Sequence, residues 1–383
     1  MKIAYIGDFI NHGKSLQTSG TPLIILLSLR SDVTSIDVYC PYLNDEIEEF
    51  EIPQKVRILS SYKYDDPVSI IKLIKIPWYN YDKVIFNLLP TGYGQSLLTN
   101  FIALNMPLIL TKLLKIKNVE IIYHNSVFTN NIQLLGYDTG LDRVKSFFLG
   151  IVERKLFKSV KTMVFLNLYK KRIDSSIGKN KVEVYQARYL EAITTSYQNK
   201  ILECDHIERE KNSVPIILMH GNWGPQKNID LALSALNDLK KEGLEFKLII
   251  SGGVNHHFPG YEKKFTQLIQ SNKNIINKYM GIVNEKDIMN NFLKADLLIL
   301  PYKAPGGHSG VLEQAIFFEL PTVAMDFPEY REQVYGSKNI KLTDITKLVS
   351  AIESCITNLN KEKYVSINTK LCDALKNIDE ILK

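Results

Sequence analysis

Short apolar runs rich in β-branched residues alternate with longer amphipathic stretches along the chain, and this alternation occurs twice. The runs of the first half are KIAYIG, SIDVYC, KVIFNLL, VEIIYHN and TMVFLN, and those of the second are VPIILMH, FKLIISGG, ADLLILPY and TVAMD. Stretches with helical spacing of apolar residues, such as YGQSLLTNFIALN and IDLALSALNDLKKEG, separate them. Near-continuous apolar strands joined by helices are typical of parallel sheets covered on both faces. The pattern predicts an α/β fold with two Rossmann-like domains.

The length of 383 residues also favours two domains over a single core. The segment Thr194–Ser213 lies between the two sets of strands, carries many charges and has little hydrophobic periodicity, so it is the candidate linker. We expect an N-terminal domain over residues 1–195, a second domain over 214–360, and a C-terminal helix over 361–383 that could pack back on the N-terminal domain. Open α/β sheets bind ligands at the carboxyl ends of their strands, so two facing sheets would place a site in a central cleft.

The composition is that of a soluble globular protein, with 45% hydrophobic and 23% charged residues. No apolar run reaches the ~18 residues of a membrane span. The opening MKIAYIGD is typical of a strand that enters a loop, not of a signal peptide. The four cysteines include no C-x-x-C pair, which favours free thiols in a cytoplasmic protein. They are Cys40, Cys204, Cys355 and Cys372.

The net charge of +6 is mildly basic. It fits a solvated lysine-rich surface, and it also fits attraction for anionic ligands or an anionic membrane surface. No module typical of nucleic-acid binding accompanies it. The stretch Leu108–Asn118, LILTKLLKIKN, mixes leucine and isoleucine with three lysines. It could be a basic amphipathic helix that lies peripherally on a membrane, or a helix with a solvated face.

Two loops have features of anion-binding sites. After the strand that ends at His220, the loop contains Gly221, Gly224 and Pro225, followed by Lys227 and a plausible N-cap at Asn228. Lys227 would then lie beside free amides at a helix N-terminus, where an anion binds favourably. A surface lysine beside a helix cap is the alternative.

The second loop is GGHSGVLEQ, residues 306–314. Its glycines allow close approach of the backbone to a ligand, and Ser309 can cap the helix that follows, so that the amides of Gly310 and Val311 face an anion. Glu313, one turn in, can accept hydrogen bonds from two neighbouring hydroxyls, or it can simply favour the helix N-terminus. The chain has neither a Walker loop nor a G-x-G-x-x-G fingerprint, which argues against nicotinamide chemistry.

The first half has its own candidates at strand ends. Gly20 and Thr21 open a long apolar helix, and His124 ends the strand VEIIYHN. A structural histidine and a functional one are about equally expected at the lip of a parallel sheet. His256 and His257 have no partners at metal-ligand spacing, so no role follows for them.

Together these parts resemble the GT-B glycosyltransferases of the retaining family 4, group 1 type, over nearly the whole chain. GNWGPQKNIDLALSAL is similar to the family segment whose lysine binds the donor diphosphate, and Lys227 falls on that lysine. SGVLEQAIFFELPTVAMD is similar to the segment whose carboxylate binds the ribose, and Glu313 falls on that carboxylate. Gly20 matches the N-terminal glycine loop, and His124 matches the histidine near the donor sugar.

MGIVNEKDIMNNFLKADLLILPY is similar to a third family segment. The resemblance implies that Gly281, Ile282 and Val283 border the nucleotide base through backbone contacts. It therefore implies a donor site formed by residues of all three segments together with Gly20. They are Gly20, Lys227, Gly281, Ile282, Val283, His308, Ser309, Gly310, Val311 and Glu313.

The chain departs from the family pattern at several positions. Pro305 stands where the family often has the first glutamate of E-x7-E, which puts the sugar contact in doubt, and we expect His308 and Ser309 to supply it. Asn222 stands where the family has an arginine, so Lys227 would carry most of the diphosphate charge. The candidates for a second cation are Arg188 and Arg331. Glu319 stands where a glycine is usual, so a positive φ there would cost about 1 kcal/mol.

The resemblance implies an enzyme that moves a hexose from a nucleotide-diphosphate sugar to an acceptor hydroxyl, with retention and without a metal. Its catalytic residues would be His124, Lys227 and Glu313. No cofactor is needed besides the UDP- or GDP-linked donor. The acceptor could be a glycan, a lipid-linked sugar or a protein. The alternatives are a non-catalytic GT-B protein that binds a nucleotide sugar, and a GT-B sugar-nucleotide epimerase.

Overall fold

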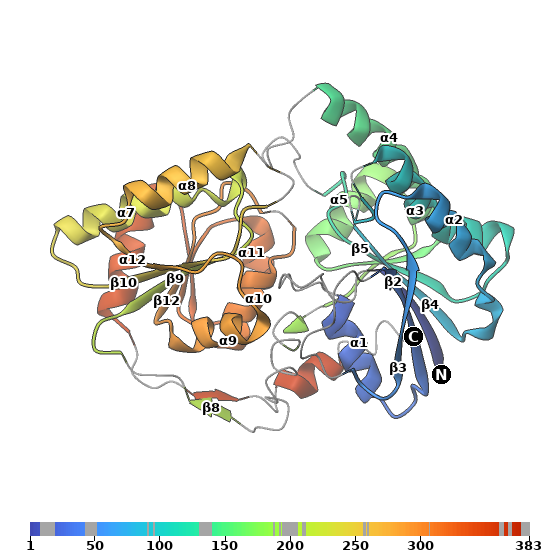
Figure 1. Cartoon of the computed structure of the whole chain (residues 1–383), viewed down its shortest axis with the longest axis horizontal. Coiled ribbons are helices and arrows are strands. Elements are labelled where there is room, and N and C mark those ends of the chain that lie inside the picture. The colour runs from blue at the N-terminus through green and yellow to red at the C-terminus, as the bar shows by residue number, and fades with distance from the viewer. Residues whose placement is uncertain are drawn as a thin grey trace. The chain divides into compact units, whose positions relative to one another are not determined.

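The computed structural model describes most of the chain: residues 1–7, 20–42, 52–89, 92–94, 96–129, 140–186, 188–190, 193, 206–208, 212–255, 258, 260–305, 307–359, 364–366 and 370–376. The chain divides into two compact units (Figure 1). The first comprises Met1–Gln133, Tyr137–Leu190 and Asp373–Lys383, and the second comprises Leu134–Gly136 and Glu191–Cys372.

The described part of the first unit contains a sheet of seven parallel strands in the order β3-β2-β1-β4-β5-β6-β7. Its central strands are the apolar runs predicted from the sequence, because strands buried on both faces need apolar residues at every position. The strands are β1 (Lys2–Ile6), β2 (Ser35–Pro41), β3 (Val56–Tyr62), β4 (Lys83–Leu88), β5 (Val119–Tyr123), β6 (Lys161–Val164) and β7 (Val182–Val184).

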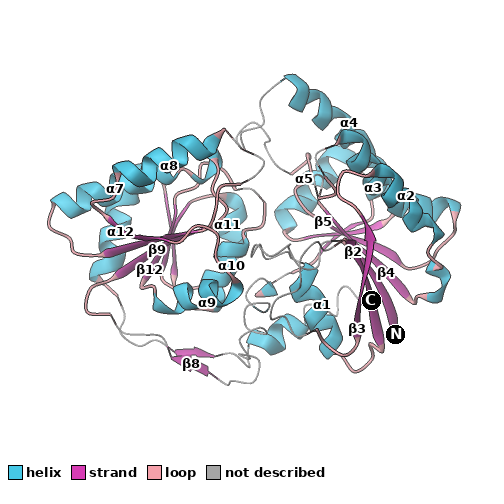
Figure 2. Cartoon of the chain, viewed as in Figure 1, coloured by secondary structure: helices cyan, strands magenta, loops and turns pink. Residues whose placement is uncertain are grey.

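Helices cover both faces of this sheet (Figure 2). Helix α1 (Gly20–Leu29) lies on one face, and its residues up to Ser28 are buried, which explains its almost wholly apolar sequence. The other face carries α2, α3 and α4, as right-handed crossovers from β3, β4 and β5 require. These helices are α2 (Pro67–Lys72), α3 (Leu97–Leu108) and α4 (Gly140–Ser159), with short turns η1 (Leu73–Lys75) and η2 (Trp78–Asn80) after α2. Helix α5 (Asn167–Ile177) follows β6.

The stretch Leu108–Asn118 is not one amphipathic helix. Helix α3 contains Pro107 and continues only as a short π-helical turn, η3 (Ile109–Leu113). Proline lacks the amide that an α-helix needs, and such a break in the regular hydrogen bonding commonly accompanies a change of helix type. Lys115 and Asn118 then adopt positive φ, which ends the helix before β5.

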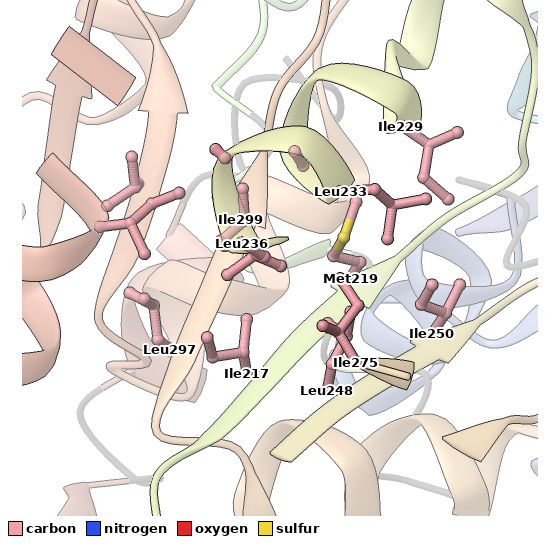
Figure 3. Close-up of a cluster of buried hydrophobic side chains, with 14 of the residues drawn as sticks. Ile217, Met219, Ile229, Leu233, Leu236, Leu248, Ile250, Ile275, Leu297 and Ile299 are labelled. Atoms are coloured by element: carbon pink, nitrogen blue, oxygen red, sulfur yellow. The ribbon is translucent and has the colours of Figure 1, made fainter. Parts of the chain in front are cut away.

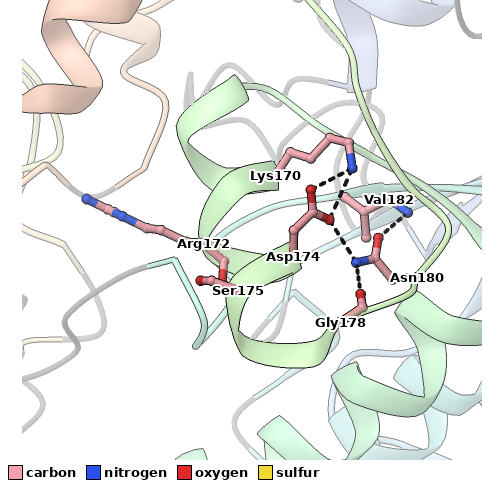
Figure 4. Close-up of polar contacts among 7 residues, drawn as sticks. All are labelled: Lys170, Arg172, Asp174, Ser175, Gly178, Asn180 and Val182. Atoms are coloured by element: carbon pink, nitrogen blue, oxygen red, sulfur yellow. Dashed lines mark hydrogen bonds and ion pairs between the residues drawn. The ribbon is translucent and has the colours of Figure 1, made fainter.

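A compact polar turn joins α5 to β7 (Figure 4). The Asn180 amide donates to Asp174 Oδ1 at 2.9 Å and to the Gly178 carbonyl at 2.6 Å, while Asn180 Oδ1 accepts from the Val182 amide at 2.9 Å. Lys170 completes the cluster through an ion pair with Asp174. These bonds fix where the last strand of the sheet begins.

The described part of the second unit contains a sheet of six parallel strands in the order β11-β10-β9-β12-β13-β14. The strands are β9 (Ile216–His220), β10 (Lys247–Ser251), β11 (Ile276–Tyr279), β12 (Leu297–Leu300), β13 (Thr322–Met325) and β14 (Ile340–Thr343). The helices are α7 (Ile229–Lys241), α8 (Tyr261–Ser271), α9 (Glu285–Lys294), α10 (Gly310–Phe317), α11 (Pro328–Gln333) and α12 (Leu348–Thr357), with short turns η5 (Pro225–Lys227) and η6 (Ile345–Lys347).

A core of the second unit lies between its sheet and the helices α7, α8 and α12. Figure 3 shows the part that packs against α7. Ile229, Leu233 and Leu236 follow one another at helical spacing and pack against Met219 of β9 and Ile250 of β10. This spacing is the apolar stripe that the sequence predicted. It holds α7 on β9, the strand that precedes the loop of Lys227.

The candidate linker contains a small strand where it is described. Residues His206–Glu208 form β8, which pairs antiparallel with β15 (Tyr364–Ser366). Beyond β15, residues 370–376 are helical, within the predicted C-terminal helix. Lys370 is buried and donates to the Phe317 carbonyl at 2.6 Å and to Glu319 at 2.7 Å, so this segment closes the C-terminus of α10.

Three of the four cysteines, Cys40, Cys355 and Cys372, lie in the described residues and form no disulfide there. Cys204, His256 and His257 lie outside the described residues. Among the helices that the structure describes, none combines the length and the apolar character needed to cross a membrane.

Candidate functional site

The predicted site residues of the second unit follow the carboxyl ends of its strands. Lys227 lies in the loop after β9, Gly281 to Val283 follow β11, and the segment from His308 to Glu313 follows β12. In a parallel sheet these strand ends meet at one edge. The structure therefore brings the predicted residues of this unit to a single edge of the sheet.

Lys227 ends the turn η5, in which Pro225 occupies the first position. Asn228 follows in the left-handed conformation, with φ of 50°, and is the N-cap residue of α7, but its side chain makes no hydrogen bond to the helix. The Lys303 amide donates to the Gln226 carbonyl at 2.8 Å, which ties this loop to the loop after β12. The position of Lys227 is thus fixed from both sides.

The ammonium of Lys227 lies over the ring of Tyr302, 3.7 Å from its centre. This cation–π contact favours the charged amine. Burial disfavours it and has the larger effect, lowering the pKa of Lys227 to about 7. No carboxylate among the described residues forms an ion pair with Lys227. The site therefore holds a desolvated cation that lacks a counter-charge from the described protein.

Two buried polar atoms beside this lysine also lack protein partners. The Tyr302 hydroxyl and Gln226 Oε1 form no hydrogen bond within the described structure. Burial raises the pKa of Tyr302, so its hydroxyl stays protonated. Below them, His220 Nδ1 bonds the Ser251 hydroxyl at 2.7 Å, and burial lowers the pKa of His220 to about 4. Unsatisfied buried polar atoms are rare in proteins, and those beside Lys227 indicate a place for a polar ligand.

The loops after β9 and β10 approach each other closely at Gly252. Its φ is 103°, and a Cβ added there would lie 1.8 Å from the Gly221 carbonyl oxygen. Any other residue would therefore push the Gly221 loop away. The Gly252 amide donates to the Gly281 carbonyl at 2.6 Å. Backbone groups therefore hold together the loops that follow β9, β10 and β11.

The segment Gly281–Val283 offers both backbone and apolar surface. Gly281 has a φ of 62°, which re-aims the chain after β11. Val283 is buried and anchors the segment, whereas Ile282 is exposed and its side chain lies against Gly253. A flat ligand group could rest on Ile282 and bond the neighbouring backbone.

Helix α10 places Glu313 in its first turn and buries it. The Ser309 hydroxyl accepts from the Leu312 amide at 3.3 Å, so Ser309 is the N-cap that the sequence predicted. Glu313 Oε1 accepts from His308 Nε2 at 3.1 Å and from Gln333 Nε2 at 3.0 Å. These two donors fix the orientation of the carboxylate.

Gln333 is a residue that the sequence analysis missed. It lies at the end of α11, donates to the Ser309 carbonyl at 2.8 Å, and accepts from the Ser309 amide at 3.1 Å. One buried side chain thus clamps both the cap of α10 and Glu313. Tyr302 was missed as well, and no local pattern marks either residue, because their roles depend on contacts between separate loops.

In the first unit, His124 follows β5 and is half-buried. His124 Nε2 bonds Asn87 Oδ1 at 2.6 Å, and its ring lies 4.7 Å from that of Phe165. Asn87, at the carboxyl end of β4, is a further residue that the sequence did not single out. Gly20 begins α1 and is buried, and residues 8–19, which precede it in the predicted loop, lie outside the described residues.

A buried carboxylate holds the loop that follows His124. Glu153 of α4 accepts hydrogen bonds from the Tyr123 and Ser126 hydroxyls and from the Val127 amide. Burial is the largest influence and raises the pKa of Glu153 to about 7, against the three donors, which lower it. On its far side the same loop is held by Arg172, which donates to the Thr129 carbonyl at 2.6 Å and projects away from the polar turn (Figure 4).

The structure also bears on the candidates for a second cation and on the departure from the family pattern at Glu319. Arg331 forms a two-point ion pair with Asp326, at 2.6 Å for each bond, so its charge is already matched. Arg188 lies in the first unit. Glu319 has a φ of 51°, so the positive φ expected at this non-glycine position is confirmed. Among the described residues no cluster of histidine, cysteine and acidic side chains could hold a metal ion.

Comparisons with known proteins agree with this arrangement. Residues 203–371 match the family described as Glycosyl transferases group 1. The curated proteins include no match to the chain. Over residues 203–371, this match supports the family recognition and the enzyme class, a glycosyltransferase, that the sequence predicted.

Solved structures share the fold over the full chain. Sucrose-phosphate synthase from Thermosynechococcus elongatus is 12% identical, with a TM-score of 0.67 over 99% of this chain and 96% of its own. HepE from Anabaena in complex with UDP-glucose is 14% identical, with a TM-score of 0.60 over 100% of this chain and 94% of its own. WaaG, a glycosyltransferase involved in lipopolysaccharide biosynthesis, is 14% identical, with a TM-score of 0.58 over 99% and 94%. The fold class predicted from the sequence is confirmed.

Proposed function

Because residues 203–371 form a group 1 glycosyltransferase domain in a chain with the GT-B fold, we propose that this enzyme transfers a hexose from a nucleotide-diphosphate sugar to an acceptor hydroxyl. The reaction retains the anomeric configuration and needs neither a metal nor a further cofactor. The observation that carries this proposal is a half-buried lysine with no ion-pair partner among the described residues, and an oriented buried carboxylate at the same edge of one sheet.

Departure of the diphosphate is the demanding step, since negative charge builds on its oxygens. Lys227 meets that charge in a desolvated setting, where a cation stabilises an anion far more than it does in water. The first-turn amides of Gly310 and Val311 in α10 point toward the same anion by the helix-dipole rule. The Tyr302 hydroxyl, which has no protein partner among the described residues, is placed to donate a further bond.

Glu313 binds the ribose hydroxyls and so positions the donor. Gln333 and His308 hold the carboxylate in place for this contact, which means that His308 supports Glu313 in addition to the sugar contact expected of it. The backbone of Gly281–Val283 and the exposed side chain of Ile282 border the base. A uridine donor is favoured, because HepE, which shares the fold, is described in complex with UDP-glucose.

The first unit supplies the acceptor side. His124, oriented by Asn87, contacts the donor sugar or the reacting face, and Gly20 borders the diphosphate. The acceptor is a glycan, a lipid-linked sugar or a protein, and the enzyme works in the cytoplasm, where it contacts a membrane peripherally. Nucleic acid is not a partner.

A thermal-shift measurement tests the donor site. Purified protein is mixed with UDP, GDP, ADP and their sugars, without added metal. A nucleotide at about a hundredfold excess over its dissociation constant stabilises the fold by about 2.7 kcal/mol, so a true donor raises the Tm clearly. Glu313→Ala and Lys227→Ala should abolish the shift, while the matched surface variant Glu242→Ala keeps it. A well-folded wild type that responds to no nucleotide would overturn the proposal.

Binding must also be separated from turnover. Release of nucleoside diphosphate in the presence of acceptor, lost in Lys227→Ala with the fold intact, marks a transferase. Nucleotide binding without release would favour the non-catalytic alternative, and conversion of the donor sugar without any acceptor would favour an epimerase. The Pro305 and Asn222 departures motivate both comparisons.

A further inference from the structure

Helix α4 turns an apolar stripe outward. Val144, Phe147, Phe148 and Ile151 recur at the helical spacing of one face, and all four are exposed, Phe147 by 67%. The opposite face of the helix carries the buried Leu156 and Phe157. A helix normally has one apolar face, which packs on the core, so the outer stripe of α4 needs a different explanation.

The neighbouring helix extends this apolar surface. Helix α3 packs against α4 on the same side of the sheet (Figure 2). Leu97, Leu98 and Phe101 share one face of α3 and are exposed, and Leu113 in the turn η3 is 74% exposed. Large apolar side chains are thus exposed on several adjoining elements. The surface of a monomer usually carries such side chains only singly and scattered.

Basic side chains accompany the exposed apolar residues of these elements, and acidic side chains are rare there. Residues 97–118 contain no Asp or Glu but three lysines, and α4 contains five cations against Asp142 and the buried Glu153. Arg143 and Lys145 flank the apolar stripe in sequence, and Lys112 flanks Leu113. Interfaces between proteins are depleted of lysine, whereas an apolar face with basic neighbours suits an anionic bilayer.

We propose that the exposed face of α3, η3 and α4, here called the α3–α4 face, docks on an anionic lipid bilayer. Phe147, Phe148 and Leu98 enter the boundary between headgroups and acyl chains, while Arg143 and Lys145 contact lipid phosphates. The inference rests on the proposed function, because it makes the acceptor a hydroxyl presented at the membrane surface.

The structure connects this face to the candidate site. The inner side of α4 carries Glu153, which holds the loop directly after His124 through Tyr123, Ser126 and Val127. A bilayer bound to the outer side of α4 is therefore one helix away from the loop of His124. A lipid-linked acceptor could reach the sheet edge of the first unit without leaving the membrane.

Co-sedimentation with vesicles tests the apolar part. The full chain is mixed with vesicles of phosphatidylcholine alone and with vesicles of equal parts phosphatidylcholine and phosphatidylglycerol, without nucleotide. We expect the wild type to bind the anionic vesicles, and Phe147→Ser/Phe148→Ser to lose affinity about tenfold or more. The matched control is Tyr335→Ser/Ile345→Ser, which removes two exposed apolar side chains from the second unit and should bind normally.

A second pair of variants tests the charged part. Arg143→Gln/Lys145→Gln should weaken binding to the anionic vesicles about thirtyfold at low salt, because each cation near such a surface contributes about 1 kcal/mol. The control Lys338→Gln/Lys341→Gln removes the same charge from the second unit and should leave binding unchanged. Added salt should weaken the wild type and reduce the difference between these variants.

Three results would overturn the proposal: no binding of the wild type to anionic vesicles, equal binding by Phe147→Ser/Phe148→Ser, or a wild-type dimer in sedimentation velocity that this variant converts to monomer. The last result would assign the α3–α4 face to self-association. Since the substituted side chains are exposed, all variants should melt as the wild type does. The nucleotide thermal shift, run on the same samples, shows separately whether the donor site exists.

Discussion

The ammonium of Lys227 rests 3.7 Å from the centre of the Tyr302 ring, and the two residues come from loops that follow different strands. The ring partly replaces the water that the ammonium has lost, yet the pKa of Lys227 still falls to about 7. A lysine in this state is about half charged at neutral pH. An arriving diphosphate therefore finds a group that is ready to gain a proton.

The first prediction concerns the pH dependence of nucleotide affinity. A bound diphosphate raises the pKa of Lys227, because a nearby anion favours the charged amine. Below pH 7 the free lysine already carries its proton, whereas above pH 7 binding must take one up. We expect affinity to fall by up to about tenfold per pH unit above 7. Titration calorimetry in buffers of different ionisation enthalpy measures the proton uptake, which Lys227→Arg should abolish, since arginine stays charged.

The second prediction concerns Gln333. Replacing it with alanine removes the donor to Glu313 and both bonds to Ser309, so nucleotide affinity should fall by about 1–3 kcal/mol in binding free energy. Asn339→Ala is a matched control, because Asn339 bonds the carbonyls of Ala315 and Leu320 at the other end of the same helix. The control should lower the Tm and leave affinity intact. Equal affinities for Gln333→Ala and the wild type would contradict the role given to this clamp.

The third prediction separates a clash from backbone strain. Gly252 and Gly243 both have positive φ, but a Cβ at Gly252 meets the Gly221 carbonyl, whereas one at Gly243 meets nothing within 4 Å. Gly243→Ala should cost about 1 kcal/mol of unfolding free energy. Gly252→Ala should cost clearly more and should also displace the Gly221 loop, which weakens nucleotide binding. Denaturant unfolding of both variants measures the difference, and equal losses would be inconsistent with the close approach.

The fourth prediction concerns Glu153. Its pKa is raised to about 7 in the folded protein from an ordinary value of 4.5, so the folded state keeps its proton over a range where the unfolded state has released it. The unfolding free energy contributed by this group should therefore decrease as pH rises from 4.5 to 7. Glu153→Gln cannot titrate and should lack this decrease, measured as the difference in unfolding free energy between variant and wild type across that range. A constant difference would show that Glu153 does not titrate there.

The strands that the sequence revealed are those at the centre of each sheet. In the two parallel sheets that the structure describes, the strands it missed are β3, β7, β11 and β14, which are the edge strands of those sheets. Edge strands have fewer neighbours and mix exposed with buried positions, as β3 does along Val56–Tyr62, so they lack the continuous apolar run that marks a central strand. Sequence patterns therefore predict the inside of such a fold better than its borders.

The same distinction applies to the candidate site. Lys227, Ser309 and Glu313 lie in local patterns of glycine, cap and helix, and could be selected from the sequence. Tyr302 and Gln333 owe their positions to contacts between loops far apart in the chain, and no local spacing encodes those contacts. The amphipathic helix considered for Leu108–Asn118 does not form for a local reason. Pro107 and two residues in the left-handed conformation shorten the helix that the composition of this stretch suggests.

The buried bonds from Lys370 to the Phe317 carbonyl and Glu319 have a consequence for the order of events during synthesis. Lys370 follows Glu319 by 51 residues, which take a ribosome about 3 to 10 seconds to add. During that interval α10 exists without the side chain that closes its end, next to a glutamate in the left-handed conformation. The helix that bears Glu313 is thus among the last parts of its unit to be fully stabilised while the chain is being synthesised.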